Sequence, residues 1–232
     1  MTTGCVVLLS GGLDSATVLA IATRERGLRA SCLTFDYGQR HRHEIDCARR
    51  VAWELGAASH RVLGLDPAIV AGSELTGGGD VPRDLDPGRG GIPDTYVPAR
   101  NTLFLAHALA ESERAGTELI LIGANAVDYS GYPDCRPEYL QAFECMANLA
   151  TREAVEGRAR YRVEAPLLRM AKGEIVAKGS ALGLDFALTS SCYDPSEDGA
   201  ACGRCDSCAL RARGFAAAGL RDPRARPAQP AM

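Results

Sequence analysis

The stretch that decides the fold is Ser10-Gly11-Gly12-Leu13-Asp14-Ser15, which directly follows the apolar run at residues 5–9. The apolar run predicts a fully buried strand, and the spacing of apolar residues over 16–23 predicts a helix that stops at Gly27. The hexapeptide therefore lies at the carboxyl end of the first strand. An open parallel sheet binds its ligands at this place, so the sequence predicts a binding loop there.

The composition of the hexapeptide indicates an anion as the ligand. Its two glycines let the backbone approach phosphate oxygens, and the amides of the following helix, with the hydroxyls of Ser10 and Ser15, can donate to them. Asp14 would repel a bare phosphate, but it fits if a magnesium ion bridges its carboxylate to the phosphates. The loop matches neither the Walker pattern nor G-x-G-x-x-G. The alternative is a plain strand-to-helix turn with Asp14 as the helix N-cap.

Outward from this loop, short apolar runs alternate with amphipathic stretches. Strands are predicted at residues 30–35, 60–65, 118–123 and 161–165, and helices at 43–55, 101–115, 136–156, 172–182 and 206–218. This alternation indicates βαβ units, so we predict an α/β fold with a doubly wound, mostly parallel sheet. The glycine- and proline-rich stretch 66–99 interrupts the alternation and is typical of a lid or a binding loop.

The overall composition excludes several classes of protein. The 232 residues include 26 basic and 29 acidic ones, and the net charge of −3 argues against a general polyanion binder. No stretch reaches the ~20 apolar residues that a membrane span needs, and no charged leader is visible. We therefore expect a cytoplasmic protein that binds neither membranes nor, directly, nucleic acid.

The nine cysteines fall into two groups. Four of them, Cys192 and the C-x-x-C-x-x-C run of Cys202, Cys205 and Cys208, have the spacing of a metal site, since four thiolates can close a tetrahedron about 2.3 Å around zinc. Such a site has no open position, so we expect one structural zinc per chain. Three close cysteines also occur around iron–sulfur clusters, but the usual fourth cysteine and following proline are missing here. The remaining alternative for these four is that they are buried and bind no metal. That state is the one we expect for the five scattered cysteines, Cys5, Cys32, Cys47, Cys135 and Cys145.

The hexapeptide resembles the pyrophosphate loop (PP-loop) of the ATP pyrophosphatase superfamily, whose members cleave ATP between the α and β phosphates to adenylate a substrate. From residue 4 to about 220, the chain is similar to one branch of it, the 7-cyano-7-deazaguanine synthase family. This narrower resemblance rests on residues 8–15, 35–41, 97–102, 123–125, 191–192, the cysteine run and the segment Asp128-Tyr129-Ser130-Gly131-Tyr132-Pro133-Asp134-Cys135-Arg136. Many members have glycine where this chain has Ala99. Alanine does not easily adopt φ > 0, so we expect a turn there that tolerates a Cβ.

The resemblance implies an adenine-nucleotide α-hydrolase-like fold and an ATP-dependent ligase. Its substrates would be 7-carboxy-7-deazaguanine and ammonia, and its product would be the nitrile. The reaction would consume two ATP and pass through an adenylated acid, an amide and an adenylated amide. Catalysis would depend mainly on positioning and charge stabilisation. Four alternatives remain: an enzyme that stops at the amide, one that transfers the acyl group to another amine, a PP-loop enzyme that modifies transfer RNA, and a non-catalytic zinc module.

The resemblance also implies which residues bind ATP and act in catalysis. The ATP-binding residues are Leu8, Leu9, Ser10, Gly11, Gly12, Leu13, Asp14, Ser15, Ala16, Thr17 and Val18. The catalytic group comprises the residues that would hold phosphates or the substrate carboxylate: Ser10, Asp14, Ser15, Arg100 and Lys172. For Lys172, a solvated position at a helix start is the alternative.

The implied substrate-binding residues follow the predicted strands. They are Tyr37, Gln39, Arg40, His41, Arg100, Asn101, Asp128, Tyr129, Ser130, Gly131, Tyr132, Asp134 and Arg136. Asp128 and Asp134 could accept hydrogen bonds from a guanine-like edge, and Tyr129 or Tyr132 could stack on its ring, unless this is only a turn-rich loop. His41 could take a proton from ammonium, unless it is merely an exposed loop histidine.

The domain organisation follows from these assignments. Residues 1–187 would form the ATP-binding and substrate domain, residues 188–220 a C-terminal zinc-binding segment, and residues 221–232 a disordered tail, since the last stretch is broken by prolines. Similar proteins are often homodimers, so the resemblance implies a homodimer here as well.

Overall fold

The protein is built on one parallel sheet. A computed structural model describes residues 3–39, 42–73, 75–76, 81, 83–84, 92–93, 95–125 and 131–225. The sheet consists of β1 (Gly4–Leu8), β2 (Arg29–Asp36), β3 (Ser59–Gly64), β4 (Leu119–Leu121) and β5 (Arg162–Glu164). The strand order is β3-β2-β1-β4-β5, and all four neighbouring pairs are parallel. The predicted α/β fold with a parallel sheet is confirmed.

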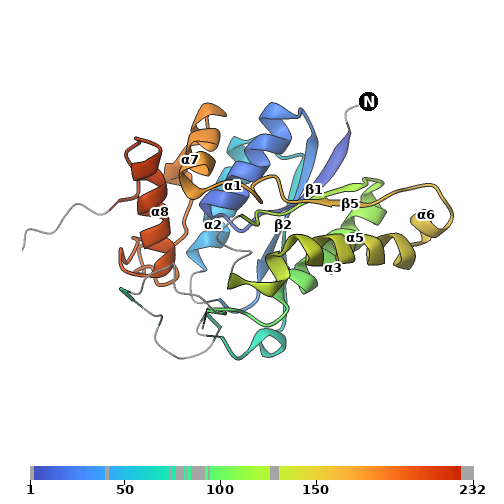
Figure 1. The fold of residues 1–232 in the computed structure, drawn as a ribbon, viewed down its shortest axis with the longest axis horizontal. Coiled ribbons are helices and arrows are strands. Elements are labelled where there is room, and N and C mark those ends of the chain that lie inside the picture. Colours follow the sequence, from blue (N-terminus) through green and yellow to red (C-terminus); the bar gives the residue numbers. More distant parts are fainter. Residues whose placement is uncertain are drawn as a thin grey trace, which may run out of the picture.

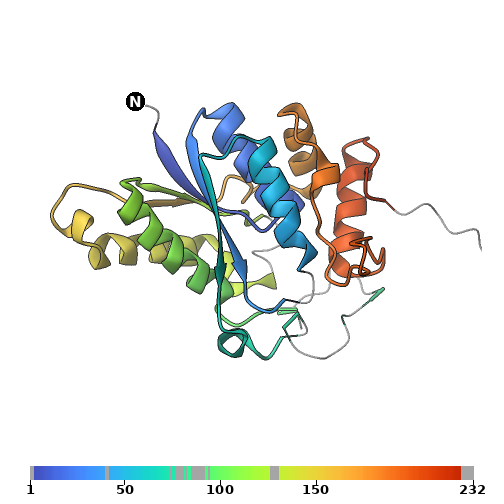
Figure 2. The same cartoon turned by 180° about the vertical axis from the view of Figure 1, so that it is seen from behind.

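Helices cover both faces of the sheet, as Figures 1 and 2 show from opposite sides. One face carries α1 (Leu13–Ala20), α2 (His43–Glu54), α7 (Lys172–Ala181) and α8 (Asp206–Ala217), and the other carries α3 (Arg100–Ala115) and α5 (Pro137–Ala150). The side chains of β1 alternate between the two cores: Cys5 and Val7 join the first, and Val6 and Leu8 the second. The buried strand was predicted from a continuous apolar run, which is what a strand covered on both faces needs.

The strand order places a crevice at the centre of the sheet. From β1 the chain moves outward through β2 and β3, then returns to place β4 on the other side of β1. At such a reversal the connections diverge, so the carboxyl ends of β1 and β4 are left open between them. The hexapeptide follows β1 directly and therefore lies at this crevice.

Two predicted helices differ from the observed ones. The helix predicted over 136–156 is wrong as one element, because Thr151 (φ −107°, ψ 145°) is extended and separates α5 from a short α6 (Arg152–Val155). The buried Thr151 hydroxyl donates to the carbonyl of Ala147 (2.9 Å), and the Glu153 amide donates to Glu113 of α3 (3.2 Å). These contacts compete with helix continuation. After α1, residues Ile21–Glu25 form a π-helical turn, and the chain then reaches the predicted stop at Gly27 (φ 61°).

The C-terminal segment packs on the main body of the protein. Phe215 of α8 is 3% exposed and belongs to the same core as α1 and α7. The Arg211 guanidinium is also buried and forms a two-point ion pair with Asp222, with Nε–Oδ2 at 2.8 Å and Nη2–Oδ1 at 2.9 Å. Of the predicted tail, residues 221–225 lie in the described part. The division at residue 187 stays a prediction.

Within the described part of the chain, no helix combines the length and the apolar character that crossing a membrane requires.

Candidate active site and metal centre

A cleft of about 240 Å³ opens at the crevice of the sheet. Its walls come from the loop after β1, the ends of β2 and β4, the first turns of α3 and α7, and residues 190–193. Parts of the chain that are far apart in sequence therefore meet at the hexapeptide. This is the arrangement that the doubly wound sheet was predicted to produce.

The backbone of the loop is held in a conformation that glycine alone fits. Gly11 has φ 89°, and a Cβ built on it would lie 2.1 Å from the carbonyl oxygen of Glu44 in α2. Its own carbonyl accepts a hydrogen bond from the Ser190 amide (2.9 Å). The glycine therefore lets α2 and the 190–191 backbone enclose the loop from two sides.

The amides at the start of α1 point to hydroxyl oxygens. The Gly12 amide donates to Ser10 Oγ (3.2 Å), and the Leu13 amide donates to Ser191 Oγ (3.3 Å). The Ser10 and Ser15 hydroxyls lie 3.0 Å apart. Donors gathered at a helix N-terminus form a ready site for an anion.

Asp14 does not cap the helix. Gly12 is the N-cap of α1 and no side chain caps it, so the alternative interpretation of Asp14 is wrong. Instead, Asp14 Oδ2 accepts hydrogen bonds from Lys172 Nζ (2.7 Å) and Asn125 Nδ2 (3.1 Å). Its second oxygen, Oδ1, is buried with no hydrogen-bond partner among the described residues. Lys172 is thus a wall of the cleft and not a solvated residue at a helix start, since only 15% of its side chain is exposed.

Arg100 faces the cleft from the first turn of α3. Its Nη1 donates to the Tyr37 hydroxyl (3.4 Å), and burial raises the pKa of that hydroxyl, so Tyr37 remains a neutral phenol. Arg100 Nε is buried, and the described part of the chain offers it no acceptor. A guanidinium with an open donor in a cleft suits a carboxylate or a phosphate.

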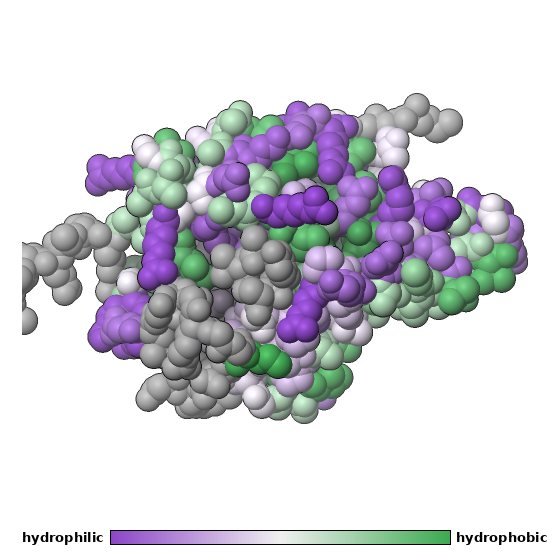
Figure 3. Space-filling model, viewed as in Figure 1, coloured by the Kyte–Doolittle hydropathy of each residue, from purple (hydrophilic) through white to green (hydrophobic). Residues whose placement is uncertain are grey.

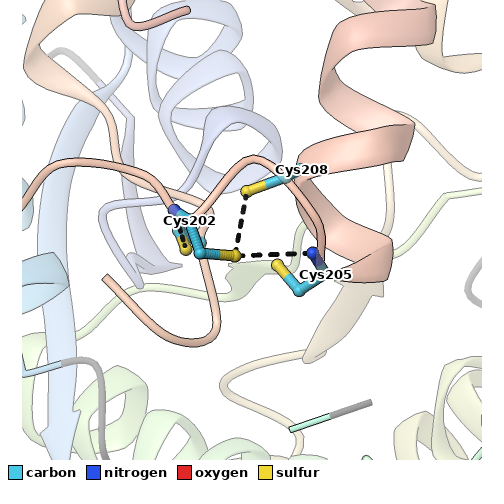
Figure 4. A group of neighbouring side chains, drawn as sticks. Cys202, Cys205 and Cys208 are labelled. Carbon is cyan, nitrogen blue, oxygen red and sulfur yellow. Dashed lines mark hydrogen bonds between the residues drawn. The ribbon is translucent and has the colours of Figure 1, made fainter. Parts of the chain in front are cut away.

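The four cysteines of the predicted metal site come together beside the cleft, and Figure 4 shows three of them, Cys202, Cys205 and Cys208. Their sulfur atoms all lie within 4.8 Å of one another, so the cluster could hold a metal ion. Backbone amides turn toward the sulfurs: Cys202 donates to Cys192 Sγ (3.2 Å), and Cys205 donates to Cys202 Sγ (3.4 Å). Hydrogen bonds from Cys192 and Cys208 lower the pKa of the Cys205 thiol. An all-sulfur set of this kind suits zinc.

Almost the whole chain matches one known protein family. A family model described as "Queuosine biosynthesis protein QueC" matches residues 4–219. The chain belongs to this family. The matched residues include both the hexapeptide at 10–15 and the four clustered cysteines, so both sites described above lie within the QueC-family match.

Individual relatives of this QueC-family chain agree with the family match. A protein named 7-cyano-7-deazaguanine synthase from Desulfatibacillum aliphaticivorans is 57% identical over 220 residues, which cover 94% of each chain. A protein of the same name from Geobacter sulfurreducens is 57% identical over 224 residues, or 96% of this chain and 93% of the relative. Both names are those of enzymes. The solved structure of NMN synthetase from Francisella tularensis has a TM-score of 0.50 at 17% identity, covers 95% of this chain and 79% of its own, and shows a likeness of fold alone.

The structure places the other predicted substrate residues of this QueC-family chain in different surroundings. Tyr132 lines the cleft and its hydroxyl bonds Thr95 (2.9 Å). Gln39 is buried with its amide bonded to the backbone of Tyr37 and Phe35, and it is not part of the cleft lining. Gly131 and Arg136 are also absent from that lining. Arg40, His41, Asp128, Tyr129 and Ser130 lie outside the described residues.

Asp134 and Asn101 form a pair that supports α3. Asp134 Oδ2 accepts from the Asn101 amide (2.9 Å), and Asn101 Nδ2 donates to the Asp134 carbonyl (3.3 Å). The preceding Ala99 has φ 51°, so the turn keeps a left-handed backbone and tolerates the Cβ only at a conformational cost. Together these residues set the position of Arg100 at the helix start.

Sequence reasoning missed several parts of the cleft. Phe35 and Phe104 stack with ring centroids 4.0 Å apart and form an aromatic wall, and Ser190 and Arg211 also line the cleft. No local pattern distinguishes these residues from core positions. The expectation that all five scattered cysteines are buried is wrong for Cys145, which is exposed on α5, and correct for the other four.

Proposed function

We propose that this chain is a 7-cyano-7-deazaguanine synthase, an ATP-dependent ligase that converts 7-carboxy-7-deazaguanine and ammonia into the nitrile. Relatives with 57% identity over almost the whole chain carry this name. The observation that carries the proposal is the loop after β1, where Oδ1 of Asp14, without a hydrogen-bond partner among the described residues, lies beside Lys172 and the start of α1. This group of charges suits a metal-bound polyphosphate.

ATP is the nucleotide that we assign to this loop. The hydroxyls of Ser10 and Ser15 and the N-terminal end of α1 would hold the pyrophosphate end. Asp14 Oδ1 is a hard oxygen ligand to which no described residue donates a hydrogen bond, and it therefore fits Mg²⁺. When bound, the magnesium ion would neutralise charge on the phosphates. Lys172 would add a positive charge on the same side.

The heterocyclic acid is assigned to the neighbouring part of the cleft. Arg100 has a buried Nε without an acceptor among the described residues and would hold the carboxylate. Tyr37, Phe104 and Tyr132 supply aromatic surface around it, on which a flat ring can stack. The carboxylate would then lie between Arg100 and the phosphate loop, which is the juxtaposition an acyl adenylation needs.

The chemistry uses the same displacement twice. The carboxylate oxygen attacks the α phosphorus of ATP and pyrophosphate leaves, and ammonia then displaces AMP to give the amide and a proton. The amide oxygen attacks the α phosphorus of a second ATP, pyrophosphate leaves again, and loss of AMP and of both protons on the nitrogen gives the nitrile. The protein's own groups hold the reactants and stabilise charge, so no covalent enzyme intermediate is required.

We assign a structural zinc to Cys192, Cys202, Cys205 and Cys208. Four protein ligands leave no open position for chemistry, and the cluster packs with Val81 in a small core of its own. Elemental analysis should give one zinc per chain and a colourless protein. Iron and a brown colour would instead identify an iron–sulfur cluster.

We also propose a homodimer that forms through the outer face of α5 and α6. Met146, Leu149 and Val155 are exposed there, with Leu149 at 80% exposure, and Figure 3 shows apolar surface at this end of the molecule. In an antiparallel pair of α5 helices, the acidic Glu138 at one end would lie near Arg152 of the second copy. Sedimentation should give twice the chain mass, and Leu149→Glu should give the single chain mass.

A product assay tests the proposed function. Purified protein with 7-carboxy-7-deazaguanine, ammonium and ATP–Mg should release two AMP per product, and mass spectrometry should show the acid become first the amide and then the nitrile. Amide that accumulates would favour an enzyme that stops at the first step. An assay without AMP release would contradict the ligase assignment altogether.

A further inference from the structure

A three-residue segment, Thr189–Ser191, connects the candidate metal centre to the phosphate loop. The Ser190 amide donates to the carbonyl of Gly11 (2.9 Å), and Ser191 Oγ accepts from the amide of Leu13 (3.3 Å). The two contacts therefore lie on either side of Gly12. The next residue in the chain is Cys192, one of the four clustered cysteines.

Both ends of this segment are fixed. Thr189 is fully buried, and its hydroxyl accepts from Arg211 Nη1 (2.8 Å) and donates to the carbonyl of Phe186 (2.9 Å). At the other end, Cys192 is 4% exposed and its sulfur accepts from the Cys202 amide. Successive Cα atoms are only about 3.8 Å apart, so a shift of Cys192 must displace Ser191.

The hydrogen bond from the Leu13 amide to Ser191 Oγ lies at the first turn of α1, which borders the predicted phosphate site. By accepting the hydrogen bond of the Leu13 amide, Ser191 fixes the first turn of α1, and the N-terminus of a helix is where backbone donors for an anion are gathered. Donors that are fixed before the ligand arrives cost no reorganisation when it binds. Ser191 also lines the cleft, and by holding the first turn of α1 in place it acts on the anion donors of that turn.

We infer that Ser191 is a positioning residue, through which the metal-bound cysteine cluster fixes the amides of the phosphate loop for ATP. The inference rests on the proposed function, because it assumes that the loop binds ATP. It assigns the cluster a role beyond folding: a metal ion that holds Cys192 also holds the segment that supports Gly11 and Leu13.

The test compares Ser191→Ala, Ser191→Thr and the control Ser196→Ala in the metal-loaded protein. Ser196 lies in the same C-terminal segment, but among the described residues its hydroxyl donates to Asp198 Oδ1 and to the carbonyl of Ala200. Ser191→Ala should raise the dissociation constant of ATP and its KM about 3- to 10-fold, the effect of one lost hydrogen bond, with a smaller change in kcat. Ser191→Thr keeps the hydroxyl and should restore binding, and Ser196→Ala should match the wild type.

Two further readouts separate positioning from a general loss of structure. In the nucleotide-free protein, Ser191→Ala should speed hydrogen exchange at the Leu13 amide while the melting temperature and metal content stay unchanged. Partial metal removal with a chelator should weaken ATP binding in the wild type, and should weaken it less in Ser191→Ala, since the connection is already cut.

The outcomes are distinct. If Ser191→Ala binds ATP as tightly as the wild type or more tightly, or if the chelator weakens both proteins equally, the inference is overturned. If the wild-type protein itself binds no ATP, the proposed function has failed, and that result is visible before any variant is compared.

Discussion

The phosphate loop and the cysteine cluster lie side by side, but they are specified in opposite ways. The loop is held by hydrogen bonds from four parts of the chain: the amides and hydroxyls of its own residues, the backbone beside Gly11, and the side chains of Lys172 and Asn125 on Asp14. The cluster brings four sulfurs within 4.8 Å, with Val81 as its buried apolar neighbour.

The difference concerns what each site requires from outside the chain. The loop's geometry is fixed by hydrogen bonds between protein atoms, although Asp14 Oδ1 has no hydrogen-bond partner among the described residues. The cluster has several thiol groups in close contact, which become a stable unit when a cation replaces their protons. We therefore expect damage to the cluster to affect folding first, and damage to the loop to affect chemistry first.

The largest expected effect is the loss of a cysteine ligand. Cys205→Ser should remove the metal and lower the free energy of unfolding by roughly 3–5 kcal/mol, because metal binding and folding of this segment are coupled. For a chain of this size the melting temperature should fall by about 10 °C. Thermal unfolding and elemental analysis measure both effects. The control is Cys145→Ser at the exposed thiol of α5, which should change neither quantity. If Cys205→Ser keeps its stability without metal, the cysteine cluster does not need a metal to fold, and the expected difference from the loop is contradicted.

The next effect is on chemistry. Asp14→Asn keeps the shape of the side chain but removes the charge that we assign to magnesium, so kcat/KM should fall about 100- to 1000-fold. The melting temperature should change by no more than a few degrees, because the amide can still bond within the cleft. Asp46→Asn, at an exposed position of α2, is the matched control. Equal loss of stability in Asp14→Asn and Cys205→Ser would show that the loop, like the cluster, depends on its ligand to fold.

The third effect tests whether backbone geometry defines the loop. Gly11→Ala would place a Cβ 2.1 Å from a backbone oxygen of α2, at a φ of 89°. Because α2 must then shift, the free energy of unfolding should fall by about 3 kcal/mol. Gly27→Ala has a comparable φ of 61° but open space around the Cβ, and should cost only about 1 kcal/mol. Denaturant unfolding of both variants gives the difference. Similar values for the two would mean that the contact with α2 does not constrain the loop.

The smallest effect is at the start of α3. Ala99 adopts φ 51°, where glycine has no Cβ penalty, so Ala99→Gly should stabilise the protein by about 0.5 kcal/mol. The same change at Ala115, in the last turn of α3, should destabilise it by a similar amount, because that residue is helical. Opposite signs in denaturant unfolding would confirm that the turn before Arg100 is strained. Destabilisation by both changes would contradict it.

The parts of the site that sequence predicts are those encoded by local spacing. The hexapeptide after an apolar run and the C-x-x-C-x-x-C pattern each bring their key groups together within a few residues. In the structure, residues of the hexapeptide line the cleft and the cysteines of the run cluster with Cys192. The parallel sheet was also predictable, because strands that are covered on both faces appear as continuous apolar runs.

The parts that sequence could not predict depend on contacts between distant residues. Ser191 and Leu13 are 178 positions apart, and nothing local indicates that they meet. The break at Thr151 depends on Glu113 of α3, and the burial of Gln39 depends on how the chain leaves β2. In each case the local pattern allows two outcomes, and the tertiary contact selects one.

The placement of Thr189–Ser191 has a consequence for the order in which the enzyme is made. The phosphate loop is synthesised within the first fifteen residues, but the Thr189–Ser191 backbone that supports it is synthesised some 175 residues later. A nascent or prematurely terminated chain therefore carries the whole nucleotide motif without its support. Synthesis of the C-terminal segment, and not of the motif itself, completes the catalytic apparatus.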